Sequence, residues 1–354
     1  MLFKHNGYFA IRQSLQHHSN AQLLKALTER SYTQGWGLNQ TLEIDQKPVF
    51  VKRIPLTERE YLQGFNTQNL YRLPMYYHYG IGSAGFGAFR ELICHQKVSD
   101  WVLQGHTRHF PLLYDYRIWP AQAPWKKRSP EQWERHLKVW GNAPRIAEYL
   151  QAREKAAYEL VLCLEYVPDT LFAYAEQKDE RLIPLLSQVS DGLQYLNGQG
   201  VLHLDAHLGN LLTDGERVVI SDFGLALDRC FDLAADEQAF FERHRYYDQA
   251  QIIGSLGYVL WQYLGSQKTD AARAACERLG LQADRPLSVA SLHKALQLLK
   301  GEHPLQLPPE LVRLLLKHEE VLLTLGHFFD ELRQDSSKMT PWPEGLSLPL
   351  LFGF

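Results

Sequence analysis

The chain has few cysteines for its length and little net charge. Its 354 residues include only four cysteines, Cys94, Cys163, Cys230 and Cys276, and no two of them form a CxxC pair. A disulfide framework and a zinc site are therefore not expected, and a reducing compartment fits best. The formal net charge of −3 gives no long-range field that would attract nucleic acid or an anionic membrane. We expect a cytoplasmic protein with no nucleic-acid partner, and no feature of the sequence fixes an oligomeric state.

The chain also lacks a segment typical of membrane insertion. Residues 1–14 contain no apolar run long enough for a signal peptide. Residues 249–267 form a window of nineteen residues without a charge, but the window contains four glutamines, two serines and three glycines. A helix buried inside a globular lobe is therefore a better interpretation than a membrane span. With 45% hydrophobic residues the chain can bury a large core, either as one two-lobed unit or as two domains.

The most informative motif lies between residues 203 and 224. His203-Leu-Asp-Ala-His-Leu-Gly-Asn210 is followed by Ser221-Asp-Phe-Gly224. This order places Asn210 five residues after Asp205 and Asp222 seventeen residues after it. Such a set suits phosphoryl transfer, because one carboxylate must meet the acceptor hydroxyl while an amide and a second carboxylate hold the Mg²⁺ that neutralises the triphosphate. The plainer alternative, a buried polar hairpin with a surface turn, does not account for the combined spacing.

These residues resemble the catalytic loop and the Asp-Phe-Gly segment of the protein-kinase superfamily. The resemblance implies an α+β, bilobal protein kinase-like fold with a small antiparallel-sheet N-lobe and a mainly helical C-lobe, and it implies ATP and Mg²⁺ as cofactors. It further implies that Asp205 is the catalytic base and that Asn210 and Asp222 are the magnesium ligands. Phe223 would then pack beneath the αC helix of the small lobe.

The segment ahead of this motif predicts the nucleotide-binding part of the small lobe. Thr41–Asp45 and Val49–Ile54, joined by a Gln-Lys-Pro turn, predict a β-hairpin. Lys52 on the second strand resembles the kinase lysine that holds the α- and β-phosphates. The glycine-rich loop is poorly matched, since the full GxGxxG is absent and only Gly35 and Gly37 are supplied, but glycine still lets backbone amides approach phosphate.

A helix is predicted over residues 89–103, because apolar residues recur there at helical spacing. Glu91 in its first turn is our candidate ion-pair partner for Lys52. Glu58 and Glu60 remain competitors, since thirty-nine residues separate Lys52 from Glu91 and this gap exceeds the usual one. A glutamate early in a helix is also commonly a favourable contact with the helix dipole and nothing more.

Two further segments bear on the nucleotide site. The apolar strand Tyr158–Val167 resembles the fifth strand and hinge of kinases, where the backbone of Glu165 to Val167 would bind adenine. Gly80-Ile-Gly-Ser-Ala-Gly85 matches a dinucleotide-binding GxGxxG, but no strong βαβ unit surrounds it. The glycines form either a flexible lid near the phosphates or a packed irregular lead-in to the following helix, and we prefer the lead-in.

The region around the catalytic loop departs from eukaryotic-type protein kinases. Leu204 and His207 stand where those enzymes have arginine and lysine, and residues 225–245 contain no serine, threonine or tyrosine. We therefore expect activity that does not require phosphorylation of the activation segment. His207 is more typical of small-molecule kinases such as the aminoglycoside phosphotransferases, and it contacts either the γ-phosphate or the acceptor, or it is a buried hydrogen-bonding histidine.

The expected organisation comprises an N-terminal extension (1–30), an N-lobe (31–167) with insertions near 55–87 and 121–157, a helical C-lobe (168–335), and a tail (336–354) that packs back onto a lobe. The expected function is ATP- and Mg²⁺-dependent transfer of the γ-phosphate to a protein serine or threonine. A kinase for a small-molecule hydroxyl, such as that of a sugar or an aminoglycoside, is the alternative. A pseudokinase scaffold is a third possibility, which the degenerate glycine loop favours and the complete catalytic set disfavours.

Overall fold

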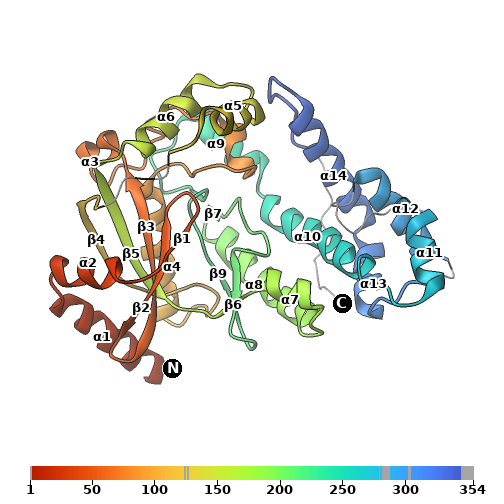
Figure 1. Cartoon of the computed structure of the whole chain (residues 1–354), viewed down its shortest axis with the longest axis horizontal. Helices are drawn as coiled ribbons and strands as arrows, with labels where there is room; N and C mark the ends of the chain where they lie inside the picture. Colours follow the sequence, from red (N-terminus) through yellow and green to blue (C-terminus); the bar gives the residue numbers. More distant parts are fainter. Residues whose placement is uncertain are drawn as a thin grey trace.

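A five-stranded antiparallel sheet forms the core of the first lobe, as the computed structural model shows (Figure 1). The structure describes residues 2–122, 125, 127–278, 280, 288–301 and 304–343. The spatial order is β1-β2-β3-β5-β4. The strands are β1 (Thr33–Gln34), β2 (Leu38–Ile44), β3 (Lys47–Leu56), β4 (Leu113–Pro120) and β5 (Tyr158–Glu165).

The predicted β-hairpin is present, but its turn differs from the one expected. Asp45 and Gln46 form the turn with positive φ angles of 49° and 61°. Such angles are those of the tight hairpin turns that match strand twist. Pro48, expected in the turn, instead lies in β3 opposite Glu43. It is tolerated because this end of the strand is exposed.

The two faces of the sheet carry different helices. Alternate residues of a strand point to opposite faces, so Val49 and Val51 join one apolar cluster while Ile54 joins another. The first cluster is completed by α1 (Leu2–His17) and α2 (Asn20–Thr28). The segment expected as an N-terminal extension thus covers one face of the sheet and helps to bury it.

The opposite face of the sheet is covered by α4 (Ala88–Leu103), which matches the helix predicted over residues 89–103. The chain reaches it through α3 (Glu58–Gln63) and a 3-10 turn, η1 (Met75–Tyr79). The buried Glu60 carboxylate accepts a hydrogen bond of 2.9 Å from the amide of Ala88. Glu60 therefore stabilises the positive N-terminal end of α4.

The segment between β4 and β5 contains two helices, α5 (Pro130–Val139) and α6 (Pro144–Glu154). In Figure 1 they lie at the top of the molecule, beyond the ends of the sheet strands. Trp140, which lies between α5 and α6, is fully buried. Its ring centroid lies 4.8 Å from that of Tyr77. The helical character predicted for residues 121–157 is confirmed within the described residues of that segment.

The second lobe is mainly helical. Its helices are α7 (Leu171–Gln177), α8 (Leu182–Gly198), α9 (Ala235–Arg243), α10 (Tyr247–Leu264), α11 (Asp270–Arg278), α12 (Val289–Leu299), α13 (Pro309–Lys317) and α14 (Glu319–Gln334). Short strands form two small sheets, β6-β8-β9 and β7-β10, from β6 (Asp169–Thr170), β7 (Val201–Leu202), β8 (Leu211–Thr213), β9 (Val218–Ile220) and β10 (Leu227–Asp228).

Helix α10 is the buried helix that the uncharged window predicts. It packs against α8, α13 and α14, and its residues Ile252, Ile253 and Leu256 are completely buried. Within the described part of the chain, no helix is long and apolar enough to cross a membrane. The five-stranded antiparallel sheet of the first lobe and the mainly helical second lobe confirm the expected α+β, bilobal fold.

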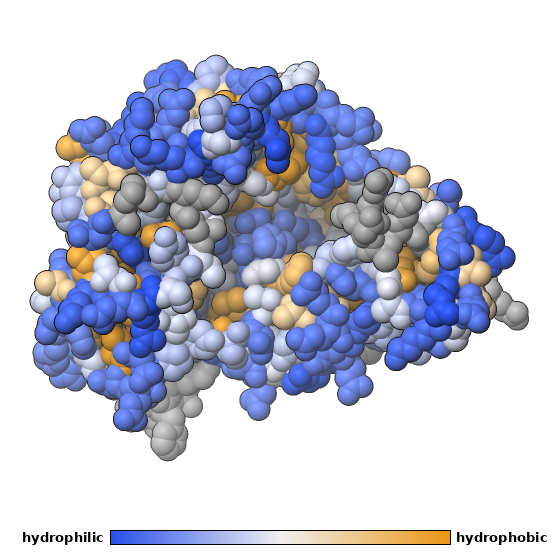
Figure 2. All heavy atoms as spheres, viewed as in Figure 1, coloured by the Kyte–Doolittle hydropathy of each residue, from blue (hydrophilic) through white to orange (hydrophobic). Residues whose placement is uncertain are grey.

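The end of the described chain packs onto the helical lobe. Trp342 is buried, with its ring centroid 5.0 Å from that of Tyr247 and 5.1 Å from that of Phe328. Residues 344–354 of the predicted tail lie outside the described residues. Figure 2 shows that the molecule is hollowed between its two lobes and that hydrophilic residues line the bottom of the hollow.

Candidate active site

Lys52 joins the two lobes through two carboxylates. Strand alternation places it on the face of β3 that looks toward α4, and its Nζ lies 2.5 Å from Oε1 of Glu91 and 2.8 Å from Oδ1 of Asp222. The predicted pairing of Lys52 with Glu91 is therefore present. The competitor Glu58 is exposed, and Glu60 is occupied at the start of α4.

The electrostatics keep Lys52 and Asp222 charged, whereas burial raises the pKa of Glu91 above its usual value. Burial alone would lower the pKa of Lys52, but Asp222 and Glu91 raise it above the usual value for lysine. Burial would likewise raise the pKa of Asp222, but the ammonium of Lys52 lowers it to about 2. Opposite charges at such distances favour the ionised form of each group. At neutral pH the network thus presents one ammonium beside an ionised aspartate, as phosphate and metal binding require.

The catalytic-loop residues converge as their spacing predicts. The side-chain amide of Asn210 donates hydrogen bonds to the backbone oxygen of Asp205 at 2.9 Å and to its Oδ2 at 3.0 Å. Burial, and then the neighbouring carboxylate of Asp222, raise the pKa of Asp205 well above its usual value. His207 is exposed, with Nε2 3.9 Å from Oδ1 of Asp205. Its exposure overturns the interpretation as a buried hydrogen-bonding residue.

A strained backbone just before Asp205 is held by Asp248. Leu204 has a φ of 62°, a left-handed conformation that leucine rarely adopts. The buried Asp248 carboxylate accepts hydrogen bonds of 2.8 Å from the amides of His203 and Leu204 and from the side chain of Asn197. Since such strain persists only where surrounding contacts impose it, Asp248 positions the catalytic loop.

The Asp-Phe-Gly segment is anchored beneath α4 as expected. Phe223 is completely buried, and its ring centroid lies 5.1 Å from those of His95 on α4 and His203 in the catalytic loop. Asp222 has a φ of 66°. The anchored phenylalanine thus holds the neighbouring aspartate in a left-handed conformation that directs its carboxylate to Lys52.

The glycine loop lies at the tip of the β1-β2 hairpin. Its neighbour Asn39 pairs with Lys52 across the sheet. A Cβ atom on Gly37 would lie 2.4 Å from the carbonyl oxygen of Arg53, so only glycine fits there. A Cβ on Gly35 would meet no atom of the described residues within 4 Å. The two glycines therefore differ in their surroundings: close packing requires glycine at position 37, whereas Gly35 faces open space.

The second glycine-rich segment, Gly80–Gly85, lies on the catalytic residues. A Cβ on Gly80 would lie 2.9 Å from Oδ1 of Asp205, and a Cβ on Gly85 would lie 2.7 Å from the carbonyl oxygen of Gly224. Both glycines have positive φ angles, 72° and 92°. The segment leads into α4, as the interpretation preferred from the sequence has it. It also lines the site.

These groups enclose a pocket of about 300 Å³, here called the catalytic pocket. Its walls include Lys52, Glu91, Asp205, His207, Asn210, Asp222, Gly35, Gly37 and residues of the Gly80–Gly85 segment. The pocket thus brings together every predicted site residue except two. Glu165 is the last residue of β5 and Val167 follows the strand, and neither residue lines the pocket.

The predicted hinge residues are held differently from the pocket residues. The backbone amide of Glu165 donates to the carbonyl of Leu112 at 2.8 Å, and its carboxylate pairs with Arg217. The amide of Val167 donates no hydrogen bond to any described residue. Val167 therefore keeps a free donor of the kind an adenine ring accepts, whereas the amide of Glu165 is already used.

A strap formed by residues 67–90 crosses from the small lobe to residues 224–244. The amide of Phe86 donates to the carbonyl of Gly224 at 3.0 Å, and the hydroxyl of Tyr79 donates to Nε2 of His244 at 2.8 Å. The strap therefore holds residues 224–244 by contacts within the chain. Independence from phosphorylation stays a prediction.

Oxygen ligands in the catalytic pocket fit Mg²⁺ bound together with a nucleotide. Among the described residues, no group of three or more His, Cys, Asp or Glu side chains could hold a metal by itself. Asn210 and Asp222 supply an amide and a carboxylate oxygen to the same pocket. Mg²⁺ is ordinarily held by one or two carboxylates plus substrate phosphates, so this sparse ligand set suits it.

Two contributors to the site, Asp248 and Arg153, were missed from the sequence. Asp248 carries a signal in retrospect, since it is a single charge at the start of an otherwise uncharged buried helix. Arg153 lines the catalytic pocket from α6, and the Gly80–Gly85 segment lies on Asp205. Arg153 has no local signal, and the glycine motif alone left a lid and a lead-in both open, because the placement of each depends on how an insertion folds back.

Known kinases match this chain over part of its length. The family model for the protein kinase domain matches residues 126–240. The serine/threonine/tyrosine-protein kinase HT1 of Arabidopsis thaliana is 26% identical over 205 residues, covering 50% of this chain and 52% of its own length. The serine/threonine-protein kinase NLK2 of Xenopus laevis is 32% identical over 178 residues, covering 43% of this chain and 39% of its own length.

These matches include the motif that forms the catalytic pocket, and over that part the chain is similar to protein kinases. It spans about half or less of the length of these curated relatives. Among solved structures, WaaP in complex with acyl carrier protein aligns over 89% of this chain and 95% of its own, with a TM-score of 0.35 and 13% identity.

Proposed function

We propose that the chain is a phosphotransferase that moves the γ-phosphate of ATP, in the presence of Mg²⁺, to a hydroxyl group. The observation that carries this proposal is the convergence of Lys52, Asp205, Asn210 and Asp222 on one pocket between the lobes. A protein that only binds partners has no chemical need for this complete set, which disfavours the pseudokinase scaffold. A cytoplasmic location, favoured by the four unpaired cysteines, is part of the proposal.

Each side chain has a distinct role in the proposed reaction. Lys52 holds the α- and β-phosphates, and Asn210 and Asp222 would hold Mg²⁺, which offsets charge on the phosphates. Asp205 orients the acceptor hydroxyl and takes its proton as the acceptor oxygen bonds to the γ-phosphorus. The bond from that phosphorus to the bridging oxygen breaks, and ADP leaves. His207, exposed beside Asp205, contacts the transferred group or the acceptor.

A serine or threonine hydroxyl of a protein is the acceptor proposed first. The intact Asp-Phe-Gly segment supports it, and so do the relatives, which are named as protein kinases. Adenine would be held by the free amide of Val167 and the carbonyl of Glu165. The glycines Gly35 and Gly37 would cover the phosphates.

A small-molecule hydroxyl is a second candidate that one observation favours. Gly80 lies against Asp205, and the strap of residues 67–90 crosses residues 224–244. That region forms part of the peptide platform in protein kinases, so the strap narrows the approach to a long peptide. A compact acceptor reaches Asp205 with fewer obstacles.

Transfer from ATP labelled at the γ-phosphate tests the proposal and separates the two acceptors. The full chain is incubated with Mg²⁺ and either generic protein substrates or a panel of sugars, aminoglycosides and other hydroxylated metabolites. Label in protein supports the first acceptor, and label in a metabolite supports the second. Nucleotide binding without transfer to any acceptor and without hydrolysis would instead identify a pseudokinase.

A further inference from the structure

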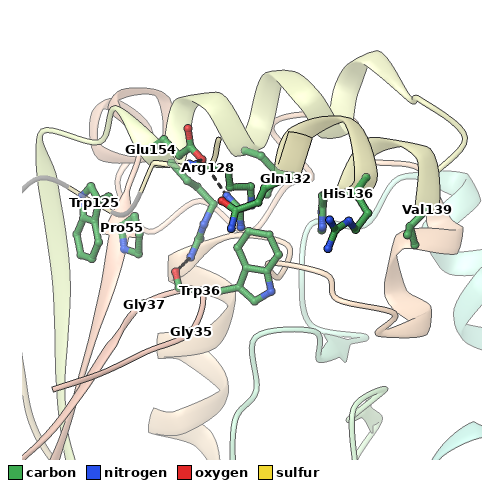
Figure 3. Close-up of a pocket in the computed structure, with 13 residues that line it drawn as sticks. Gly35, Trp36, Gly37, Pro55, Trp125, Arg128, Gln132, His136, Val139 and Glu154 are labelled. Atoms are coloured by element: carbon green, nitrogen blue, oxygen red, sulfur yellow. Dashed lines mark hydrogen bonds and ion pairs between the residues drawn. The ribbon is translucent and has the colours of Figure 1, made fainter. Parts of the chain in front are cut away.

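A second pocket lies on the outer side of the glycine loop. This outer pocket has a volume of about 350 Å³, and Figure 3 shows the side chains that line it. It is formed by α5 and α6 above and by Gly35, Trp36 and Gly37 below. The same three loop residues, together with Arg153, also line the catalytic pocket. The glycine loop is thus a shared wall between the two pockets.

The outer pocket carries more positive than negative charge. Its charged residues are Arg128, Arg135, Arg153 and Glu154, and Glu154 pairs with Arg128 at 2.9 Å. Arg135 is exposed and Arg153 is buried, and neither forms an ion pair with any described residue. The Nε of Arg153 has no hydrogen-bond partner among the described residues. One exposed and one buried guanidinium therefore lack a directly contacting carboxylate among the described residues that line this pocket.

Burying a guanidinium without a carboxylate is costly unless another group compensates it. The Arg153 side chain donates to the carbonyl of Trp36 at 2.8 Å and to the hydroxyl of Tyr149 at 3.1 Å. Both hydrogen-bond partners are neutral, and the Glu60 carboxylate favours the charged form of Arg153 without forming an ion pair with it. His136, whose buried Nε2 has no hydrogen-bond partner in the described part of the chain, supplies a further nitrogen to the same pocket.

The pocket also has walls suited to an organic group. In Figure 3, Trp36 projects into the pocket. The guanidinium carbon of Arg128 lies 4.2 Å from the centroid of the indole ring, and the ring centroids of Trp36 and His136 are 5.3 Å apart. Val139, Leu150 and Pro55 add apolar surface. A bare inorganic ion would leave these surfaces unused.

We propose that the outer pocket binds a small organic molecule through an anionic group, a phosphate or a carboxylate. The anion lies between the guanidinium of Arg135 and the Arg128–Trp36 stack, near Arg153 and His136. Guanidinium groups recognise carboxylates and phosphates by charge-assisted hydrogen bonds. Because Trp36 belongs to the glycine loop, the bound anion fixes that loop, a consequence that rests on the proposed nucleotide site.

Titration of the full chain with inorganic phosphate and with citrate, without nucleotide, tests the site directly. Isothermal calorimetry compares the wild type with Arg135→Gln and with a control, Lys138→Gln. Both substitutions remove an exposed cation from α5, but Lys138 does not line the pocket. We expect the dissociation constant of citrate to rise about tenfold in Arg135→Gln, the effect of losing one charge-assisted hydrogen bond, and to stay within about twofold in Lys138→Gln.

Equal citrate affinity in the wild type and Arg135→Gln overturns the proposal, as does no binding to the wild type. Citrate binding to a Lys52→Met variant shows where the anion lies. If the folded variant loses binding, the anion lies in the catalytic pocket, and this result also overturns the proposal. Circular dichroism verifies that Lys52→Met is folded. If Lys52→Met is not folded, citrate binding is instead measured with the wild type in excess Mg²⁺ and ATP analogue. Retained citrate binding then places the anion outside the catalytic pocket.

Turnover measurements then distinguish two sources of the anion. If the anion is a free effector, citrate changes the rate of ATP hydrolysis without acceptor in the wild type and not in Arg135→Gln. If the anion is part of the acceptor, Arg135→Gln raises the KM for that acceptor, citrate competes with it, and hydrolysis without acceptor is unaffected. The binding arm needs no turnover, so its failure is separate from failure of the proposed function.

Discussion

A guanidinium nitrogen of Arg90 lies 2.7 Å from Oε1 of Glu237, and both side chains are only 1% exposed. Arg90 is in the first turn of α4 in the small lobe, whereas Glu237 is in the first turn of α9, next to the activation segment. The Nε of Arg90 also donates to the carbonyl of Thr67 in the strap at 2.6 Å. The ion pair therefore connects α4 of the small lobe with the helical lobe, and the hydrogen bond of Arg90 adds the start of the strap to this connection.

Breaking this pair should destabilise the protein strongly. Glu237→Gln removes the carboxylate and leaves Arg90 buried without a counter-ion, so we expect the free energy of unfolding to fall by about 3–5 kcal/mol. The matched control is Glu242→Gln on the same helix, whose partner Arg229 is half exposed. That change should cost less than about 1 kcal/mol. Urea unfolding of both variants gives the comparison, and equal losses would contradict the role of the buried pair.

Asp205→Asn tests the assignment of the base. The amide cannot accept the acceptor proton, and general base catalysis is worth about 10²–10⁴ in rate, so kcat should fall by at least about 100-fold. Nucleotide affinity should change little, because Lys52 and Asp222 are untouched. Steady-state kinetics together with calorimetric nucleotide binding measure both quantities. Turnover retained at the wild-type rate removes Asp205 from the base role.

Asp248 should act on activity without touching the substrates. Asp248→Ala removes the acceptor for three hydrogen bonds at 2.8 Å and releases the strained backbone at Leu204. We expect at least a tenfold loss of kcat and a stability loss of about 2–4 kcal/mol, since buried donors lose their partner. Asp191→Ala, an exposed residue of α8, is the control for losing an aspartate. Wild-type kcat in Asp248→Ala would show that the catalytic loop holds its own conformation.

Acid should destabilise the strap through His244. Burial lowers the pKa of this histidine from its ordinary 6.5 to about 4, and its Nδ1–H donates to the carbonyl of Phe240 while Nε2 accepts from Tyr79. Between pH 6.5 and pH 4 the unfolded chain binds one proton more than the folded chain at this residue. The stability contribution is therefore present above pH 6.5 and is lost as the pH falls toward 4, by about 3 kcal/mol.

Denaturant unfolding between pH 8 and pH 4 measures this slope. His244→Gln should be less stable at pH 7 but show a flatter dependence on pH. His106→Gln, an exposed histidine, should leave the slope as in the wild type. Parallel pH profiles for the wild type and His244→Gln would remove His244 as a source of acid sensitivity.

The sequence alone placed much of the site, since a catalytic motif is local. Asp205, Asn210 and Asp222 belong to one loop-hairpin segment, and Lys52 was identified because its strand resembles the one that carries the nucleotide lysine of kinases. The pairing of Lys52 with Glu91 needed the structure, because thirty-nine intervening residues could have brought Glu58 or Glu60 there instead.

Features that depend on the folding of insertions could not be predicted in this way. The close approach of Gly80 to Asp205 has no local signature, and the same glycines also suit a simple lead-in to α4. The charge on Arg153 likewise acquires meaning only where α6 meets the glycine loop. Such contacts join residues far apart in the chain, and no local periodicity encodes them.

Calorimetric binding of ATP with and without Mg²⁺, to the wild type and to Asp222→Asn, tests the central claim most directly. The account predicts that Mg²⁺ tightens ATP binding to the wild type and that this gain is lost in Asp222→Asn, while weak metal-free binding remains. ATP affinity that does not respond to Mg²⁺ in the wild type, or a Mg²⁺ gain that is unchanged in Asp222→Asn, would contradict it.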